Sequence, residues 1–414
     1  MSTQRSGRAA ITGIGVIAPN GQRTDAYWKS VREGLSVLDR ITREGCGHMP
    51  LQVAGEVQGF DPSALIEDRF LVQTDRFSHF AMAAAALALD DAGLGSGPAE
   101  PFSVGVVTAA GSGGGEFGQR ELQKLWGQGS KFVGPYQSIA WFYAASTGQI
   151  SIRGGFKGPC GVVASDEAGG LDSLAHAARA VRRGTDTMLV GAAEAPLAPY
   201  SMVCQLGYPE LSTVAEPDRA YRPFTSSACG FVPAEGGALL VVEDERKARE
   251  RGVPVRATLA GHAATFTSAA RWTDSREGLA RAIRGALDEA GCAPEEIDVV
   301  FADAMGVPEA DRAEALAIGD ALGGHGRRVP VTAPKTGIGR AYCAAPVLDT
   351  VAAVLAMEHG QVPPTPNVFD VCHDLDLVTE RARTAELRTA LVLSRGLMGS
   401  NAALVVRRGG ESAR

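Results

Sequence analysis

The chain has 414 residues, of which 45% are hydrophobic and 21% are charged, so it can bury a large core as two domains or as one duplicated domain. Its formal net charge of −7 and its dispersed basic residues argue against a nucleic acid as partner. No run of about 18 apolar residues could span a membrane, and residues 1–7 lack the apolar core of a signal peptide, so we expect a cytoplasmic protein.

The first part of the chain alternates strand and helix patterns. In order, these are a buried strand at residues 8–16, a helix at 24–35, an Ala-rich core helix at 77–92 and a strand at 104–108. A glycine-rich loop follows at 110–118, but no Gly-Lys-Ser/Thr motif accompanies it, which argues against a phosphate loop. Residues 136–152 are apolar and aromatic, and we expect them to pack in a core or an interface and to end in a strand.

A strand, a sharp turn and a helix follow one another at residues 162–172. The β-branched pair Val162-Val163 gives way to Ser165-Asp-Glu167, and a helical pattern then begins at Leu171. Such an elbow brings Glu167 to the N-terminus of a helix, where unpaired N–H groups and the helix dipole favour negative charge. Enzymes place nucleophiles at this kind of position.

The same order of patterns returns in the second half of the chain. Leu89-Asp-Asp-Ala-Gly-Leu94 recurs as Leu287-Asp-Glu-Ala-Gly-Cys292, each time between a helix and a strand. Residues 8–13 are weakly echoed at 256–261. A repeated order of strand, helix and strand indicates two similar α/β halves.

Several stretches resemble the β-ketoacyl synthases, and the resemblance extends from about Arg8 to Arg408. The stretches that carry it are the elbow at 162–172 and the segments 219–224, 230–243, 301–311 and 330–340. The resemblance implies a thiolase-like α/β fold, a duplication in five layers ordered α-β-α-β-α. We expect the two thiolase-like halves to span residues 1–253 and 254–414.

The catalytic groups of the family are replaced at each matching position. Glu167 stands where the family has its cysteine nucleophile, Asp303 and Arg340 stand where it has two histidines, and Lys335 is retained. Claisen condensation needs a thiolate and both imidazoles, so we expect none of the three replacements to be catalytic. Arg340 is expected to pair with Glu167 or Asp303 and so to neutralise buried charge.

This pattern resembles the chain-length factor of aromatic type II polyketide synthases, whose elbow usually reads Gln-Ala-Gly-Gly-Leu-Asp against Glu167-Ala-Gly-Gly-Leu-Asp172 here. The resemblance implies a noncatalytic subunit that forms a heterodimer with an active ketosynthase and sets polyketide length. The acyl carrier protein would deliver the polyketide on its phosphopantetheine, and this chain would bind no cofactor or metal of its own.

The resemblance also implies two sets of functional residues. The end of the substrate tunnel would be lined by Gly115, Phe117, Gly118, Leu122 and Tyr200. The subunit interface would include Ile139, Trp141, Phe142 and Tyr143. Side chains at 115, 118 and 122 are small or moderate where the family often has bulkier ones, which favours a long polyketide.

Two other functions stay open at this point. Glu167 could serve a malonyl-carrier-protein decarboxylase, by analogy with loading ketosynthases that carry glutamine at the elbow but keep their histidines. A thiolase-like fold could also serve an unrelated binding or scaffold role. The seven cysteines are scattered and never in C-x-x-C spacing, which argues against zinc and against a disulfide framework. Cys343, the cysteine nearest Arg340, is a poor substitute nucleophile, because an isolated cysteine usually packs as a small core residue.

Overall fold

The computed structural model describes residues 7–95, 100–268 and 272–410. Within these ranges eleven strands form one sheet in the order β12-β10-β9-β14-β15-β8-β1-β7-β6-β4-β5. The strands of the first half are β1 (Ala9–Ile17), β4 (Val104–Ala109), β5 (Cys160–Val163), β6 (Thr187–Glu194) and β7 (Gly236–Asp244). Those of the second half are β8 (Ala257–Phe266), β9 (Val299–Phe301), β10 (Pro330–Thr332), β12 (Asp376–Leu377), β14 (Thr389–Arg395) and β15 (Ser400–Arg408).

The sheet repeats one arrangement of five strands. The order β1-β7-β6-β4-β5 in the first half returns as β8-β15-β14-β9-β10 in the second. The halves join where β1 and β8 pair antiparallel through Ala10 with Thr258 and Ile11 with Ala257. The proposed boundary after residue 253 falls in the link between α9 (Glu245–Glu250) and β8.

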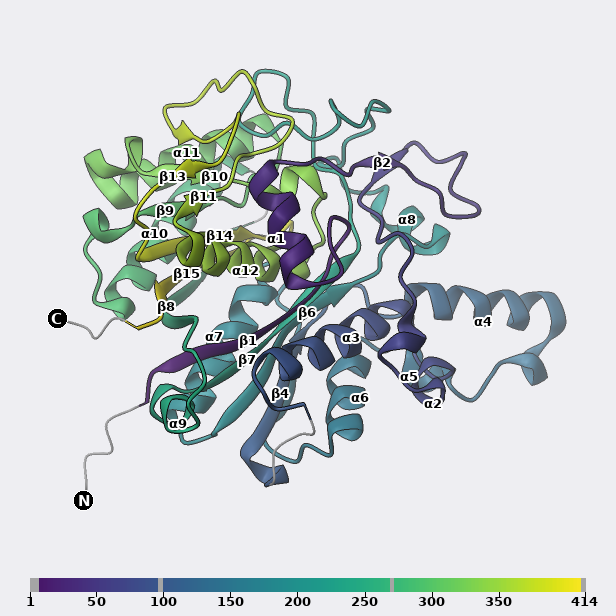
Figure 1. The fold of residues 1–414 in the computed structure, drawn as a ribbon. Helices are drawn as coiled ribbons and strands as arrows, with labels where there is room; N and C mark the ends of the chain where they lie inside the picture. Colours follow the sequence, from purple (N-terminus) through teal and green to yellow (C-terminus); the bar gives the residue numbers. More distant parts are fainter. Residues whose placement is uncertain (1–6, 96–99, 269–271, 411–414) are drawn as a thin grey trace.

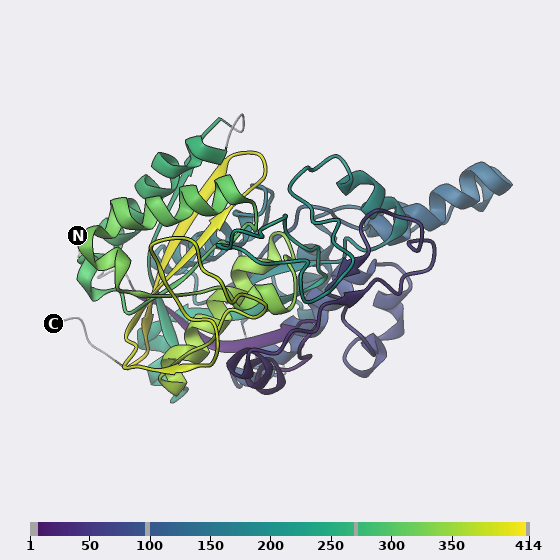
Figure 2. The same ribbon diagram turned by 90° about the horizontal axis from the view of Figure 1, so that it is seen from above.

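Helices cover both outer faces of the sheet and fill the space between its halves (Figures 1 and 2). The outer helices are α3 (Arg76–Asp91) and α6 (Ala145–Gly154) on the first half, and α10 (Ser275–Ala290) and α11 (Pro308–Leu322) on the second. Helices α7 (Gly169–Arg182) and α12 (Ala344–His359) each contact strands of both halves. The duplicated five-layer architecture expected from the sequence is therefore confirmed.

The weak sequence repeat marks the closest approach of strand and helix in each half. A Cβ on Gly13 of β1 would lie 2.2 Å from the carbonyl oxygen of Ala88 in α3. A Cβ on Gly261 of β8 would lie 2.3 Å from the carbonyl oxygen of Ala286 in α10. Both distances are far below van der Waals contact, so only glycine lets the helix lie this close to the strand. The two copies of the repeat therefore each have a glycine where a strand packs closely against a helix.

The strand expected at the end of residues 136–152 is wrong. The segment forms α5 (Gln137–Ala140) and the helix α6, which ends at Gly155 in the left-handed conformation with a φ of 65°. The alternation of Gln149, Ile150, Ser151 and Ile152 suggests a strand, yet Ile152 is 67% exposed, and small side chains let α6 pack against α3.

Helix α4 (Gly115–Gln128) projects from the body of the molecule (Figures 1 and 2). The chain returns through a short 3-10 turn at Ser130–Phe132, and we call residues 115–136 the α4 arm. Glu121, which is buried, accepts a hydrogen bond from the N–H of Gly134 at 2.5 Å and pairs with Lys124 at 2.6 Å. The return segment is thus tied to the helix. Large apolar side chains of the arm remain exposed, namely Leu122, Trp126, Phe132 and Tyr136.

Short elements complete the chain. They are α1 (Thr24–Glu33), α2 (Asp68–Leu71), α8 (Pro199–Gln205) and the strand pairs β2 (Asp39–Arg40) with β3 (Val53–Ala54) and β11 (Gln361–Val362) with β13 (Arg383–Thr384). The expected helix at residues 24–35 and the expected strand at 104–108 are confirmed by α1 and β4.

Candidate functional site

The turn between β5 and α7 forms the elbow that the sequence predicts. Asp166 has a φ of 58°, in the left-handed region that few side chains adopt. Its carboxylate accepts a hydrogen bond from the N–H of Met398 at 2.6 Å. Gly170, in the first turn of α7, lies so close to α12 that a Cβ would be 2.2 Å from the carbonyl oxygen of Cys343. Glu167, between these two fixed points, is buried.

Arg340 is enclosed by acceptors from three parts of the chain. Its Nε donates to Glu167 Oε2 at 2.5 Å, and its Nη2 donates to Asp303 Oδ1 at 2.7 Å. The guanidinium also donates to the carbonyl oxygens of Asp303 at 2.9 Å and Arg395 at 2.6 Å. Arg340, Glu167 and Asp303 are each at most 2% exposed. The ion pair expected between Arg340 and Glu167 or Asp303 is confirmed, and it forms with both.

A second buried arginine, which sequence reasoning missed, extends this network. Arg395 Nε lies 3.1 Å from Asp303 Oδ2, and its Nη2 lies 2.9 Å from Glu314 Oε2. Glu314 in turn accepts the backbone N–H groups of Asp303 at 2.7 Å and Ala304 at 2.9 Å. Glu314 lies on the same face of α11 as the buried residues Ala310 and Ala317. A charged residue on the apolar face of a helix is the sequence signal that could have revealed it.

Lys335 completes the positive charge around Asp303. Its Nζ pairs with Asp349 at 2.5 Å and donates to the carbonyl oxygens of Ala302 at 2.8 Å and Asp303 at 3.1 Å. Burial opposes ionisation of Asp303, but Arg340, Arg395 and Lys335 together hold its pKa below the usual range. Asp303 is therefore the ionised centre of the network.

Glu167 has the opposite electrostatic balance. Burial raises the pKa of its carboxyl to about 7, although Arg340 favours the ionised form. Arg340 is already shared with Asp303, so it compensates only part of the burial cost at Glu167. Oε1 of Glu167 has no hydrogen-bond partner in the described part of the chain, which fits a carboxyl that readily takes up a proton.

Other buried carboxyls near the network also have raised pKa values, as Glu167 does. Burial raises the pKa of Asp311 to about 7, although it accepts the N–H groups of Phe224 and Gly306, both at 2.9 Å. Burial also raises the pKa of Asp349 to about 6 and that of Glu314 above its usual value. These groups bind protons more readily when the chain is folded.

The network contains neither the thiolate nor the imidazoles that Claisen condensation needs. Arginine does not give up its proton in proteins, and Glu167 and Asp303 are tied to arginines. Cys343, the cysteine considered as a substitute, is buried and lies 3.0 Å from the carbonyl oxygen of Asp166. Burial raises the pKa of its thiol well above the ordinary value, so the reactive thiolate is disfavoured.

The residues expected to line a tunnel lie together where α4 meets α8. Four of them, Gly115, Phe117, Gly118 and Leu122, are on α4, and Tyr200 is at the start of α8. The N–H of Tyr200 donates to Gln119 Oε1 at 2.8 Å, and a Cβ on Gly115 would lie 2.1 Å from Ser201 Oγ. Phe117 and Gly118 are buried, whereas Leu122 and Tyr200 are exposed. Their role as a tunnel wall stays a prediction.

The residues expected at an interface adjoin this set. Trp141, Phe142 and Tyr143 are exposed and form a row of ring contacts, with centroids 5.8 and 4.6 Å apart, while Ile139 is half-buried. A Cβ on Gly118 would lie 3.9 Å from Trp141 Cβ, an ordinary contact. The two predicted sets are therefore adjacent, although the role of the second as an interface also stays a prediction.

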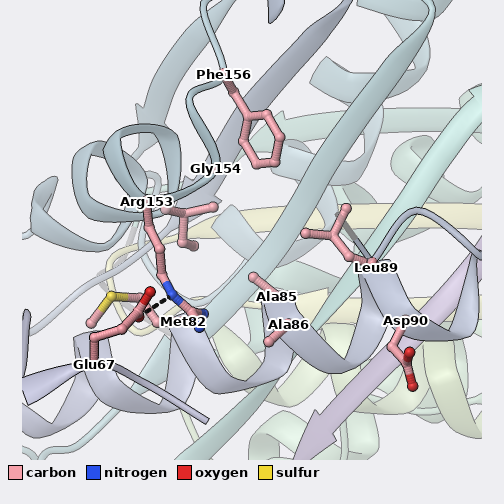
Figure 3. A pocket seen from close by; sticks show the side chains of 11 residues that line it. Glu67, Met82, Ala85, Ala86, Leu89, Asp90, Arg153, Gly154 and Phe156 are labelled. Atoms are coloured by element: carbon pink, nitrogen blue, oxygen red, sulfur yellow. Dashed lines mark hydrogen bonds and ion pairs between the residues drawn. The ribbon is translucent and has the colours of Figure 1, made fainter. Parts of the chain in front are cut away.

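A cavity of about 410 Å³ lies between α3 and α6, on the outer face of the first half. Figure 3 shows the side chain of Arg153 pointing toward Glu67, and the two pair at 2.7 Å. The rest of the lining includes the apolar side chains of Met82, Leu89 and Phe156 (Figure 3). The cavity shares no lining residue with the ion-pair network or with the predicted tunnel.

No group of three or more His, Cys, Asp or Glu residues is arranged to hold a metal ion in the described ranges. None of the described helices has the length and apolarity needed to cross a membrane.

Known proteins match nearly the whole chain. The family profile for the β-ketoacyl synthase N-terminal domain matches residues 7–248, and that for the C-terminal domain matches residues 256–369. A Streptomyces cyaneus protein provisionally named polyketide beta-ketoacyl synthase 2 is 77% identical over 408 residues, which cover 98% of this chain and 97% of that protein. The tetracenomycin polyketide synthase ketoacyl synthase beta subunit of Streptomyces glaucescens is 49% identical, with 97% and 98% covered.

Solved structures match over a similar extent. The ishigamide ketosynthase/chain length factor has a TM-score of 0.90 and 30% identity, with 98% of this chain and 100% of that chain covered. A second structure, AntDE:AntF, is described as a type II polyketide synthase acyl-carrier protein in complex with its ketosynthase bound to the hexaketide. It has a TM-score of 0.86 and 26% identity, with 98% of this chain and 100% of that chain covered.

The raised pKa of Glu167 predicts a pH dependence of stability. Folding raises the pKa from 4.5 to about 7, so the folded chain binds this proton more tightly. The stabilisation is present at low pH and is lost as the pH rises through about 7. Between pH 5 and 7 the unfolding free energy of the wild type should fall more steeply than that of Glu167→Gln, by at most about 1.4 kcal/mol per pH unit.

Urea unfolding at half-unit steps of pH would measure both slopes. Glu44→Gln, at an exposed glutamate, is the matched control and should leave the slope of the wild type unchanged. Equal slopes for the wild type and Glu167→Gln would mean that Glu167 stays ionised in the folded chain.

Proposed function

The chain belongs to the β-ketoacyl synthase family, and from this premise we propose that it is the noncatalytic chain-length factor of a type II polyketide synthase. In this role it forms a heterodimer with an active β-ketoacyl synthase and sets the length of the polyketide. The observation that carries the proposal is the closed ion-pair network of Glu167, Arg340 and Asp303, which occupies the positions of the nucleophile and both histidines.

Two surfaces of the chain favour an obligate protein partner. Strand β5 ends the sheet, is partly exposed, and pairs only with β4 among the described strands, so its free edge can pair with another chain. The α4 arm exposes Trp126 to 83% together with Leu122, Phe132 and Tyr136. Exposed apolar surface of this kind is typical of an interface that is covered in the assembled protein.

The related structures support the identity of the partners. One is titled a ketosynthase/chain length factor, and another contains an acyl-carrier protein with its ketosynthase and a hexaketide. We infer that the acyl carrier protein brings the polyketide on its phosphopantetheine to the partner ketosynthase. All seven cysteines of this chain are free, as expected in a reducing compartment, and the proposal therefore includes the cytoplasm.

The proposal predicts that polyketide formation needs this chain but not the carboxylate of Glu167. The ketosynthase should form a one-to-one complex with this chain by size exclusion with light scattering, and products should appear only from the complex. Glu167→Ala in the assembled complex should keep the rate of product formation within about fivefold, because a catalytic group would cost roughly a hundredfold or more.

Other outcomes would favour the alternatives. Malonyl-carrier-protein decarboxylation by this chain alone, abolished in Glu167→Ala, would favour the decarboxylase. Products that are the same with and without this chain would favour a scaffold role. A stable homodimer that ignores the ketosynthase would contradict the proposal.

The α4 arm should contribute directly to the heterodimer. Trp126→Ala should weaken association by about 2 kcal/mol, roughly thirtyfold in Kd, because a large aromatic side chain buried at an interface is commonly a hot spot. Phe369→Ala is the matched control, since Phe369 is 75% exposed in a loop of the second half. Surface plasmon resonance would measure the Kd of each variant for the ketosynthase. Equal Kd values for the two variants would place the arm outside the interface.

The space beside Gly118 should set the length of the product. A Cβ there would meet only Gln137 Nε2 and Trp141 Cβ, both at 3.9 Å, so a small side chain fits without displacing the backbone. A Cβ on Gly115 would instead meet Ser201 Oγ at 2.1 Å, which makes that position harder to interpret. We infer that the small side chains at this end of α4 accommodate a polyketide longer than an octaketide.

Gly118→Thr should therefore shorten the product by whole two-carbon units. One methylene of misfit changes binding by about 1–3 kcal/mol, enough to shift termination roughly tenfold or more. Mass spectrometry of products from the reconstituted complex measures the change. Gly127→Thr is the control, because Gly127 is in the same helix and a Cβ there would meet nothing within 4 Å. Unchanged lengths at preserved activity would mean that the tunnel ends elsewhere.

A further inference from the structure

Helix α4 begins with glycines, which carry no side chains to fix its position. Gly113, Gly114, Gly115 and Gly118 all lie in this stretch. The N–H of Gly114 donates to the carbonyl oxygen of Trp141 at 3.0 Å, and Gly113 has a φ of 63°. A wall that selects a chain length has to keep its place, because a shift the size of a methylene changes which chain fits. The start of α4 is therefore fixed by contacts of its backbone to other parts of the chain.

Asp75 supplies such an anchor from the neighbouring helix α3. Its Oδ1 accepts a hydrogen bond from the N–H of Phe77 at 3.2 Å, which caps the N-terminus of α3. Its Oδ2 accepts a hydrogen bond from the N–H of Phe117, in the first turn of α4, at 2.6 Å. Asp75 is 1% exposed, so water does not compete for these bonds. One buried carboxylate thus joins the N-termini of two helices, where unpaired N–H groups favour an anion.

The base of this anchor is fixed to the sheet. Arg76, the next residue, makes a bidentate contact with Glu235, from Nε to Oε2 at 2.9 Å and from Nη2 to Oε1 at 2.8 Å. Glu235 is buried and directly precedes β7. Arg43 pairs with the same carboxylate at 2.7 Å and with Glu116 of α4 at 3.9 Å. The contacts of Arg76 therefore hold Asp75 in place relative to the sheet. The hydrogen bond from Phe117 to Asp75 in turn holds the start of α4.

We propose that Asp75 positions the α4 wall of the polyketide tunnel and is thereby a determinant of product length. Its bond falls on Phe117, between Gly115 and Gly118 at the predicted tunnel end. Asp75 acts through the backbone of α4 and does not touch the polyketide. The inference rests on the proposed function, because the wall matters only if this chain sets product length.

Two substitutions at Asp75 test the contact to α4, and the second of them keeps the cap of α3. Asp75→Asn keeps the shape but replaces one acceptor oxygen by an NH₂ group, so one of the two N–H groups loses its partner. Asp75→Ser keeps a good N-cap for α3 but is too short to reach Phe117 as well. Asp244→Asn is the matched control, since Asp244 caps α9 through the N–H groups of Arg246 and Lys247.

Each variant would be co-purified with the ketosynthase, checked by light scattering, and reconstituted with the acyl carrier protein and malonyl units. Mass spectrometry then gives the distribution of product lengths. We expect both Asp75 variants to assemble and to keep total turnover within about threefold. The share of products that differ from the wild-type length should rise about tenfold, the scale set by one methylene of misfit. Asp244→Asn should leave the distribution unchanged.

A wild-type distribution from assembled Asp75→Asn and Asp75→Ser complexes would overturn the proposal. Failure of both variants to assemble would also overturn it, because Asp75 would then serve folding and not the placement of the wall. The proposed function fails separately, if the ketosynthase makes the same products without this chain. Gly118→Thr in the same assay shows whether α4 lines the tunnel at all.

Discussion

The buried guanidinium of Arg340 is the interaction on which the rest of the structure depends. Glu167 comes from the elbow of the first half, and Asp303 follows β9 in the second half, so the two carboxylates reach Arg340 from opposite halves of the chain. Arg395, at the end of β14, binds Asp303 from the other side. Charges this deep are tolerated only when every one is paired, and removing one partner leaves another uncompensated. Arg340, which the resemblance places where the family has a histidine, here joins the two halves through its carboxylate partners.

The surfaces that we propose for the partner lie at the periphery of the first half. The α4 arm leaves the body of the molecule beside the aromatic row Trp141, Phe142 and Tyr143, and its large apolar side chains stay partly or largely exposed within the described chain. Its root is nevertheless tied to the sheet through Asp75, Arg76 and Glu235. A projecting element with a rigid root is suited to present a surface to a partner without losing its own geometry, since little ordering remains to oppose association.

The sequence was sufficient to predict elements with a local pattern, and to predict an ion pair where a buried charge needs an opposite charge. The strand at 104–108, the helix at 77–92 and the elbow follow from periodicity, and Arg340 had to find a carboxylate because an unpaired buried charge is too costly. Arg395 with Glu314, and Asp75 with Phe117, join residues 81 and 42 positions apart, and no local pattern predicts such contacts. The strand expected near residue 150 was wrong because alternation over a few residues also fits a helix that packs through small side chains.

The charges of Glu167, Asp303 and Arg340 explain why these three residues occur together. Relative to the two histidines of the family, Asp303 adds a negative charge and Arg340 adds a positive one, so this pair of replacements leaves the net charge nearly unchanged. Glu167, in place of a thiol, adds an acid that the pair does not balance. Asp303 is the carboxyl whose pKa is held low by three cations, whereas burial raises the pKa of Glu167 to about 7. Because Glu167 takes up a proton readily, the network can stay close to neutral. Glutamine, which the resemblance gives as the usual residue at this position of chain-length factors, would carry no charge at any pH, whereas the charge of Glu167 depends on its protonation.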